Sequence, residues 1–231
     1  MTDTLSKAQL VSLGEDCPAV LYRGAIQVDD LLRELSWGDE WMTKLSPDQR
    51  RTLANSPPLK RDQGDRFLTL FQTAWDDRCG FFFKKEGKTA YPLNHLSPYN
   101  YDSLVDAYQD VYQQVTDFLG CSPNLFDEVM VNRYTIQGGV GWHTDADTVS
   151  RDRVAMLSLG DTRSMGLCRG DHPSRRRGAT ERHFPVRHGD LVFMPSGMQQ
   201  EWLHCIDKPD LQGKTEKDIR YSLIFRETRI N

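Results

Sequence analysis

The sequence predicts a mainly β protein of the α+β class, in which a sandwich or jelly roll carries helices on one face. Two observations lead to this prediction. A series of short strand-like runs, separated by turn formers, fills about 100 residues after Glu128. One strongly amphipathic segment, residues 103–119, precedes that series. The length of 231 residues suits one well-buried domain spanning residues 1–231.

Residues 1–128 hold the predicted helices and the less regular segments. The segment that begins at Asp29 or Asp30 is expected to be a helix, because its leucines recur at helical spacing behind a capping carboxylate. Residues 55–100 combine turn formers with aromatic runs, which is typical of short strands and loops. The amphipathic segment 103–119 ends at a glycine and is expected to cover one face of the sheet.

From residue 129 onward the pattern changes to runs with the length and alternation of strands. Glycine and aspartate residues in the intervening segments favour turns between these strands. The predicted strands are residues 129–136, 141–145, 154–159, 164–167, 190–194, 200–205 and 221–225. Together they form the predicted core of the protein.

Composition and charge narrow the class of protein. Aromatic residues make up 10% of the chain and charged residues 27%, which excludes a largely disordered protein. The formal net charge is -4 and the isoelectric point is about 5.9. This balance gives no support for tight nonspecific binding to a polyanion, so any contact with nucleic acid must be local.

Cysteine usage and hydropathy indicate the compartment. The five cysteines are odd in number and include no Cys-x-x-Cys pair, which indicates free thiols in a reducing environment. No apolar run approaches the roughly 20 residues of a membrane span, and the polar start has no signal-peptide pattern. We therefore expect a soluble intracellular protein, cytoplasmic or nuclear, with no membrane partner.

A metal site is predicted around His143 and Asp145. Side chains two residues apart on a strand point to the same face, so these two converge on one point. His204 lies on a later predicted strand and is the third candidate ligand. Two histidines and one carboxylate with open positions are the facial triad of non-haem Fe(II) oxygenases, with room for an oxo-acid and O2. The alternative is that each histidine is structural, which is common for a lone histidine.

Two arginines near the C-terminus strengthen the prediction. Arg220 and Arg226 stand an even number of positions apart, so on a strand they share one face with Ser222 and Ile224. A buried guanidinium needs an anion, and two on one face favour a dicarboxylate or a metal-bound aspartate. Surface salt bridges are the alternative for such a pair.

Residues 129–228 resemble the AlkB-like family of Fe(II)- and 2-oxoglutarate-dependent dioxygenases. The motifs that carry the resemblance are Asn-x-Tyr at 132–134, His-x-Asp at 143–145, the distal His204 and Arg-x-x-x-x-x-Arg at 220–226. The resemblance implies a double-stranded β-helix, the jelly-roll form, as a catalytic core at residues 129–228. Residues 1–128 would then be an N-terminal extension with supporting helices and a segment like a nucleotide-recognition lid.

The resemblance also implies residue roles. His143, Asp145 and His204 would bind Fe(II) and form the catalytic centre, and O2 and 2-oxoglutarate would be the cosubstrates. The residues implied to bind 2-oxoglutarate are Asn132, Tyr134, Arg220, Ser222 and Arg226. The implied reaction is oxidative demethylation of N-methylated nucleobases in DNA or RNA, as in DNA repair or RNA modification.

Substrate contacts are expected from a smaller set of residues. AlkB-like enzymes take a base out of its stack, which favours a single strand or a flipped base. Tyr91 is the preferred lid residue, and Trp142 is a further candidate contact. Asp147 could accept a hydrogen bond from an exocyclic amine. The loop of residues 169–183 carries Arg175, Arg176 and Arg177, which are expected to contact phosphates, although a solvated hairpin tip would look the same.

Two other functions fit the same sequence. The protein could keep iron and 2-oxoglutarate but hydroxylate a small metabolite or a protein side chain, which suits the acidic isoelectric point. It could also be a noncatalytic binding module, against which the intact ligand and arginine set argues. The histidines at residues 172, 183 and 188 could form another metal set, but solvent exposure is the favoured interpretation, because these residues fall in a loop and a turn.

Overall fold

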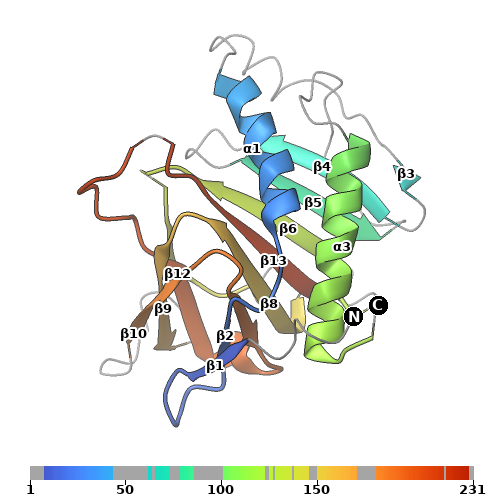
Figure 1. Cartoon of the computed structure of the whole chain (residues 1–231). Helices are drawn as coiled ribbons and strands as arrows, with labels where there is room; N and C mark the ends of the chain where they lie inside the picture. The colour runs from blue at the N-terminus through green and yellow to red at the C-terminus, as the bar shows by residue number, and fades with distance from the viewer. Residues whose placement is uncertain are drawn as a thin grey trace.

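A computed structural model gives the fold of the chain, and strands in two sheets are the predominant regular structure of the described part (Figure 1). The structure describes residues 8–43, 62–63, 66–72, 79–85, 101–122, 125–126, 128–136, 138–145, 150–170, 181–215 and 217–228.

The larger sheet has nine strands in the order β1-β2-β11-β8-β13-β6-β5-β4-β3. Neighbouring strands in this sheet pair antiparallel, and β13 lies in its centre, between β8 and β6. The strands are β1 (Gln9–Ser12), β2 (Val20–Arg23), β3 (Asp62–Gln63), β4 (Arg66–Gln72), β5 (Cys79–Lys85), β6 (Glu128–Tyr134), β8 (Ser150–Gly160), β11 (Leu191–Met194) and β13 (Arg220–Thr228).

The smaller sheet has four strands in the order β10-β9-β12-β7. They are β7 (Val140–His143), β9 (Arg163–Arg169), β10 (Arg182–Val186) and β12 (Trp202–Ile206). The two sheets face each other across a cluster of buried side chains, which includes Met156 and Ile224 from the larger sheet and Leu167 and Trp202 from the smaller one. This is a jelly roll, as the sequence predicts.

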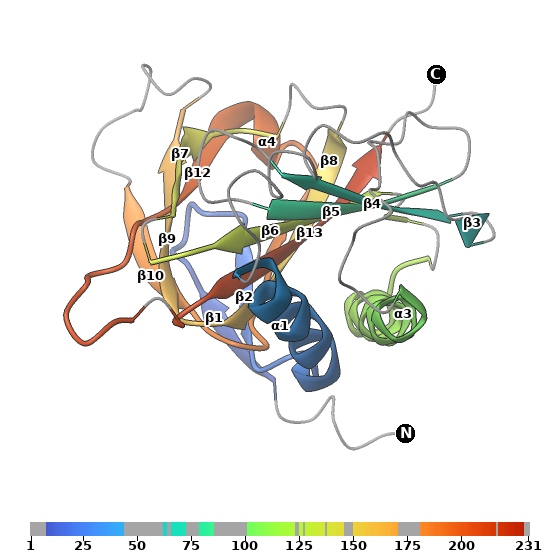
Figure 2. The same ribbon diagram turned by 90° about the horizontal axis from the view of Figure 1, so that it is seen from above.

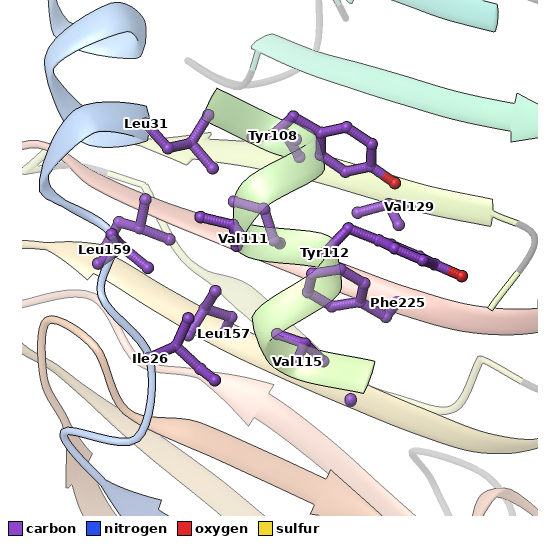
Figure 3. Packing of buried hydrophobic residues seen from close by; sticks show 14 of the residues in the cluster. Ile26, Leu31, Tyr108, Val111, Tyr112, Val115, Val129, Leu157, Leu159 and Phe225 are labelled. Carbon is purple, nitrogen blue, oxygen red and sulfur yellow. The ribbon is translucent and has the colours of Figure 1, made fainter. Parts of the chain in front are cut away.

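The outer face of the larger sheet is covered by two helices, α1 (Asp29–Thr43) and α3 (Tyr101–Leu119). Figure 2 shows both helices on the same side of β6 and β13. Tyr108, Val111 and Val115 of α3 are buried and pack against sheet residues such as Leu157 and Phe225 (Figure 3). The amphipathic spacing therefore correctly predicts a helix that covers one face of the sheet.

The side chains of β13 alternate between two buried clusters, one under the helices and one between the sheets. Tyr221, Leu223 and Phe225 belong to the cluster under the helices, whereas Ile224 belongs to the cluster between the sheets. Arg220, Ser222 and Arg226 share the parity of Ile224 and are buried with it on the inner side. The predicted facing of this strand is therefore confirmed, and it directs polar groups into the roll.

Some predicted boundaries are wrong. The two ends of the predicted loop of residues 169–183 belong to strands, because Arg169 ends β9 and Arg182 opens β10. β10 was not predicted: it is an edge strand that contains a proline, which weakens its strand signal. Residues 200–201 belong to a one-turn helix, α4 (Met198–Glu201), and Asp145 comes just after β7 rather than within a strand.

The described helices include none that is long and apolar enough to cross a membrane. Among the described residues, Cys17, Cys121, Cys168 and Cys205 are not joined in disulfide bonds.

Candidate metal and cosubstrate site

The fold brings His143, Asp145 and His204 together inside the roll. β12 pairs antiparallel with β7 so that His204 lies directly opposite His143, and their ring centroids are 4.2 Å apart. Nε2 of His204 is 3.7 Å from Oδ2 of Asp145. One ligand atom from each residue falls within 4.8 Å of the others, which is the spacing needed to share one ion.

Hydrogen bonds orient this group. Nδ1 of His143 lies 2.8 Å from the carbonyl oxygen of Gly141, so it donates there and leaves Nε2 available to an ion. The backbone N–H of Asp145 donates to Oε1 of Gln199 at 3.0 Å. Gln199 is buried on α4, so this short helix fixes the backbone that carries the carboxylate.

Charge and burial set the protonation of the group. Burial would raise the pKa of the Asp145 carboxyl, but His204, Arg226 and His143 lower it below its ordinary value. Burial and the neighbouring His143 lower the pKa of His204 to about 3, although Asp145 acts in the opposite direction. At neutral pH, Asp145 is therefore a carboxylate and His204 a neutral imidazole, the forms that bind metal ions.

Arg220 is buried on the inner side of β13, the strand that also carries Arg226 beside Asp145. Its Nη2 donates to Oγ of Ser158 at 3.0 Å, and its guanidinium lies over the ring of Tyr134, 5.1 Å from the centroid. Within the part of the chain that the structure describes, Nε and Nη1 of Arg220 have no hydrogen-bond partner, and neither has Oγ of Ser222. A buried guanidinium with unused donors is suited to an anion. The surface salt-bridge alternative is therefore wrong for Arg220.

The two residues of the Asn-x-Tyr motif lie on β6 beside Arg220 and Ser222. Tyr134 is paired in register with Arg220, and Asn132 is paired with Ser222. Nδ2 of Asn132 donates to the hydroxyl of Tyr134 at 3.4 Å. All four side chains are buried. They give this part of the roll an amide, a phenol, a hydroxyl and a guanidinium, which together suit a carboxylate.

Of the predicted substrate contacts, Trp142 lies within the described residues. Trp142 lies on the face of β7 opposite to His143, and its ring meets that of His183 edge to face at 5.7 Å. Its ring is therefore not part of the group around the triad. Tyr91, Asp147, Arg175, Arg176 and Arg177 lie outside the described residues.

Two residues of the site were not predicted. Ser158 is a polar residue in the otherwise apolar strand β8, and its parity with Met156 could have placed it on the inner face. Gln199 gives no comparable signal, because its bond to Asp145 joins segments that are far apart in sequence. Of the histidines at 172, 183 and 188, His183 contacts Asp207, His188 contacts Asp29 and the backbone of Gly160, and residue 172 lies outside the described residues.

Comparison with known proteins places this site in a family. Residues 39–231 match the 2OG-Fe(II) oxygenase superfamily. Replicase protein 1a and Replicase polyprotein 1ab of Grapevine leafroll-associated virus 3 (isolate United States/NY1) are each 28% identical over 157 residues. These matches cover 66% of this chain but only 6% and 5% of the viral proteins, so the chain spans a small part of their length.

The solved structure of OsALKBH1 is similar in fold. It aligns with a TM-score of 0.52 and 16% sequence identity, over 95% of this chain and 100% of that chain. In the present structure, two imidazoles and a carboxylate lie close enough to bind one ion, and a buried guanidinium on the larger sheet has unused donors, so the residues fit both an iron ion and a dicarboxylate. The chain shares the jelly-roll fold of OsALKBH1 and belongs to the 2OG-Fe(II) oxygenase superfamily.

Proposed function

We propose that this enzyme removes methyl groups oxidatively from N-methylated nucleobases in DNA or RNA. The observation that carries the proposal is that one roll holds both the triad His143, Asp145 and His204 and a buried Arg220 with unused donors. In this assignment the triad holds Fe(II) and Arg220 holds the far carboxylate of 2-oxoglutarate. The two roles require one cation site and one anion site inside the same roll, and the two sheets supply them.

Each neighbouring residue has a role in this assignment. Tyr134 and Ser158 fix the guanidinium of Arg220 from two sides, so it is oriented before the cosubstrate arrives. Asn132 and Ser222 supply an amide and a hydroxyl to the same carboxylate. Arg226 approaches Asp145, with its Nη1 3.8 Å from Oδ1, and favours the charged carboxylate next to the metal-chelating end of the cosubstrate.

The chemistry follows from the bound groups. When bound, Fe(II), 2-oxoglutarate and O2 supply an oxidant as the cosubstrate loses CO2 and becomes succinate. Insertion of oxygen into a C–H bond of an N-methyl group gives an N-hydroxymethyl group, which releases formaldehyde and leaves the free amine. The apolar walls of the roll, including Met156 and Ile224, exclude water from this reaction.

Support for a nucleic-acid substrate comes from two comparisons. The chain shares its fold with an ALKBH1 protein, and its curated relatives are viral proteins named as replicases. A base presented to a site inside the roll must leave its stack, which favours single-stranded substrates. Tyr91 and Asp147 remain the predicted base contacts, and Arg175, Arg176 and Arg177 the predicted phosphate contacts.

The direct test is mass spectrometry of short single-stranded DNA and RNA oligonucleotides that carry 1-methyladenine, 3-methylcytosine or 6-methyladenine. The protein is incubated with Fe(II), 2-oxoglutarate and O2, and succinate is measured in parallel. We expect a loss of about 14 mass units, because demethylation replaces CH3 by H and so removes the mass of one CH2. One succinate should form for each methyl group removed. Asp145→Ala is the control and should abolish both.

A second candidate is hydroxylation of a small metabolite or a protein side chain. The net charge of -4 favours it, because an acidic protein has no long-range attraction for a polyanion. Succinate formation by the wild-type protein without any change in the oligonucleotides would support this candidate and contradict demethylation. Binding of unmodified single strands that weakens with salt, and weakens further when Arg175, Arg176 and Arg177 are neutralised, would favour the nucleic acid.

A further inference from the structure

A second group of metal-binding side chains lies on the outer face of the smaller sheet. It consists of His183 on β10, Cys205 on β12 and Asp207 just after β12. One ligand atom from each of the three lies within 4.8 Å of the others. Cys205 directly follows His204, and adjacent residues of a strand point to opposite faces, so this group and the triad lie on opposite sides of one strand.

Gly166 explains how residues from β10 and β12 meet across the strand between them. On β9, Gly166 is paired with His183 on one side and with Cys205 on the other. A Cβ at this position would lie 2.5 Å from Sγ of Cys205 and 3.0 Å from Cε1 of His183. The space that a side chain would fill is therefore occupied by the thiol and the imidazole, which converge over the glycine.

The donor atoms are already arranged around a common point. Nδ1 of His183 is 2.7 Å from Oδ2 of Asp207, and Sγ of Cys205 is 3.7 Å from Oδ1 of the same carboxylate. Oγ of Ser164 donates to Oδ2 of Asp207 at 2.7 Å, as outer partners of metal-bound carboxylates do. The ring of Trp142 packs edge to face on His183 and limits its rotation.

Solvent can reach this group through a neighbouring pocket. The pocket has a volume of about 380 Å³, and His183 and Ser164 form part of its wall. The other walls come from segments around Phe184 and Lys208. An ion therefore has an entry path, and a fourth coordination position can be filled by water from the pocket.

We propose that His183, Cys205 and Asp207 form a second metal site, which binds Zn²⁺. Thiolate, imidazole and carboxylate are the protein ligands of zinc, and three of them with one open position form a tetrahedral site. The sulfur ligand separates this site from the triad, which offers nitrogen and oxygen alone. On binding, the Cys205 thiol loses its proton to solvent, and the His183 proton moves from Nδ1 to Nε2 so that Nδ1 can bind.

A site at this place would act on the iron centre through β12. Zinc would tie β10 to the end of β12 across Gly166, and His204 is the residue before Cys205. The ion would hold the backbone of His204 in position without touching the reacting atoms. This role is structural, and it does not depend on which substrate the oxygenase takes.

The test is titration of the metal-free, reduced full-length protein with Co²⁺, followed by near-ultraviolet absorption. Thiolate-to-cobalt charge transfer reports a sulfur ligand, and the triad has none, so this band belongs to the second site. We expect one equivalent to produce the band, and Zn²⁺ to bleach it by displacing the cobalt. Absence of the band in the wild-type protein, or failure of Zn²⁺ to displace the cobalt, would refute the proposal.

Variants separate this site from other thiols and from the triad. Cys205→Ser should remove the band, whereas the matched Cys121→Ser, at a half-buried cysteine outside the group, should leave it. His183 is exposed, so the His183→Gln variant should fold normally. Its affinity for Co²⁺ should fall more than 10-fold, because even the loss of a residue that only contacts a metal ligand lowers metal affinity by ~10- to 100-fold. Asp145→Ala should keep the band, so the two metal proposals succeed or fail independently. A band that survives in both Cys205→Ser and His183→Gln would show that the ion binds elsewhere.

Discussion

Arg226 and Asp145 approach within 3.8 Å of each other although they belong to opposite sides of the roll. Arg226 lies on β13 of the larger sheet, and Asp145 follows β7 of the smaller sheet. Both side chains are almost fully buried, at 3% and 6% exposed. Because water screens such a pair weakly, the guanidinium favours the charged form of the carboxylate and holds it toward the larger sheet.

Replacing Arg226 should therefore weaken metal binding. We expect Arg226→Gln to lower the affinity for Fe(II) by about 10- to 100-fold, the range found for groups that orient a metal ligand. Anaerobic Fe(II) titration measures this affinity. Arg153→Gln is the control, because Arg153 pairs with Glu227 at a partly exposed position and should leave the affinity unchanged. Equal affinities for Arg226→Gln and wild type would show that the pair does not orient Asp145.

Gln199 gives a second test of how Asp145 is positioned. Its Oε1 accepts the backbone N–H of Asp145, so Gln199→Met removes the acceptor while keeping the volume similar. We expect a loss of about 1–3 kcal/mol in the free energy of unfolding and weaker Fe(II) binding. Urea denaturation and Fe(II) titration measure the two effects. Gln200→Met, at the exposed neighbouring position, should change neither, and an unaffected Fe(II) affinity in Gln199→Met would argue against a positioning role.

Arg220 should control the cosubstrate rather than the metal. Arg220→Gln removes the buried charge, and the loss of one member of a buried charged pair costs about 2–5 kcal/mol. We therefore expect the Kd for 2-oxoglutarate to rise at least about 30-fold, which corresponds to the lower end of this energy range, about 2 kcal/mol. The affinity for Fe(II) should stay within a few-fold of the wild-type value. Isothermal titration calorimetry with Fe(II)-loaded protein provides the measurement. Arg169→Gln, at an exposed arginine, is the control, and a parallel loss of iron in Arg220→Gln would contradict this division of roles.

Phe225 should make a large contribution to stability. Its side chain is 0% exposed, and its ring lies 6.0 Å from that of Tyr112 and 5.9 Å from that of Phe126. Phe225→Ala leaves a cavity between β13 and α3, and such changes lower the free energy of unfolding by about 3–5 kcal/mol. Leu10→Ala, at a 63% exposed side chain, should change it by less than about 0.5 kcal/mol. Similar urea midpoints for both variants would place Phe225 outside the stabilising core.

Asp218 should respond to pH in a defined direction. The backbone N–H of Thr215 and its Oγ1 donate to Oδ2 of Asp218 at 2.5 and 2.9 Å, and these bonds hold the pKa of Asp218 below its ordinary value. Because the folded pKa is depressed, the bonds stabilise the turn above the unfolded pKa of about 3.9, and this stabilisation is lost as the pH falls through the folded pKa.

Thr215→Val removes the hydroxyl donor but keeps the backbone donor. The pKa of Asp218 should therefore rise part of the way toward its ordinary value, as measured by NMR titration of the carboxyl carbon. Thr162→Val, at an exposed threonine elsewhere, is the control. An unchanged Asp218 pKa in Thr215→Val would show that the hydroxyl does not contribute.

Sequence periodicity predicts the parts of this fold that repeat over many residues. The alternation in β13 correctly separates Phe225 from Arg226, because each side of the strand faces a different buried layer. The helical spacing of α3 is equally readable, because the helix has 19 residues and one apolar face. The helix signal depends on the burial of one face, whereas the strand signal depends on polar residues that alternate with apolar ones.

The remaining features depend on contacts between distant segments. α4 has four residues, which is too short for a periodic signal, yet it supplies Gln199 to the site. β10 has alternating exposure and a proline at a sheet edge, so its sequence resembles a loop. The meeting of His183 and Cys205 over Gly166 follows from strand pairing on both sides of β9, and no local pattern reveals it.

The division of the site between two sheets has a thermodynamic consequence. The triad belongs to the smaller sheet and its surroundings, whereas Arg220 and Arg226 belong to the larger sheet. In the proposed assignment, iron and 2-oxoglutarate together span the gap, and the unfolded chain binds neither in this way. Ligands at about 100 times their Kd stabilise a folded protein by about 2.7 kcal/mol per site. The concentration of 2-oxoglutarate would thus affect the lifetime of the folded protein as well as its turnover rate. Without the cosubstrate, one of the interactions that join the two sheets is missing.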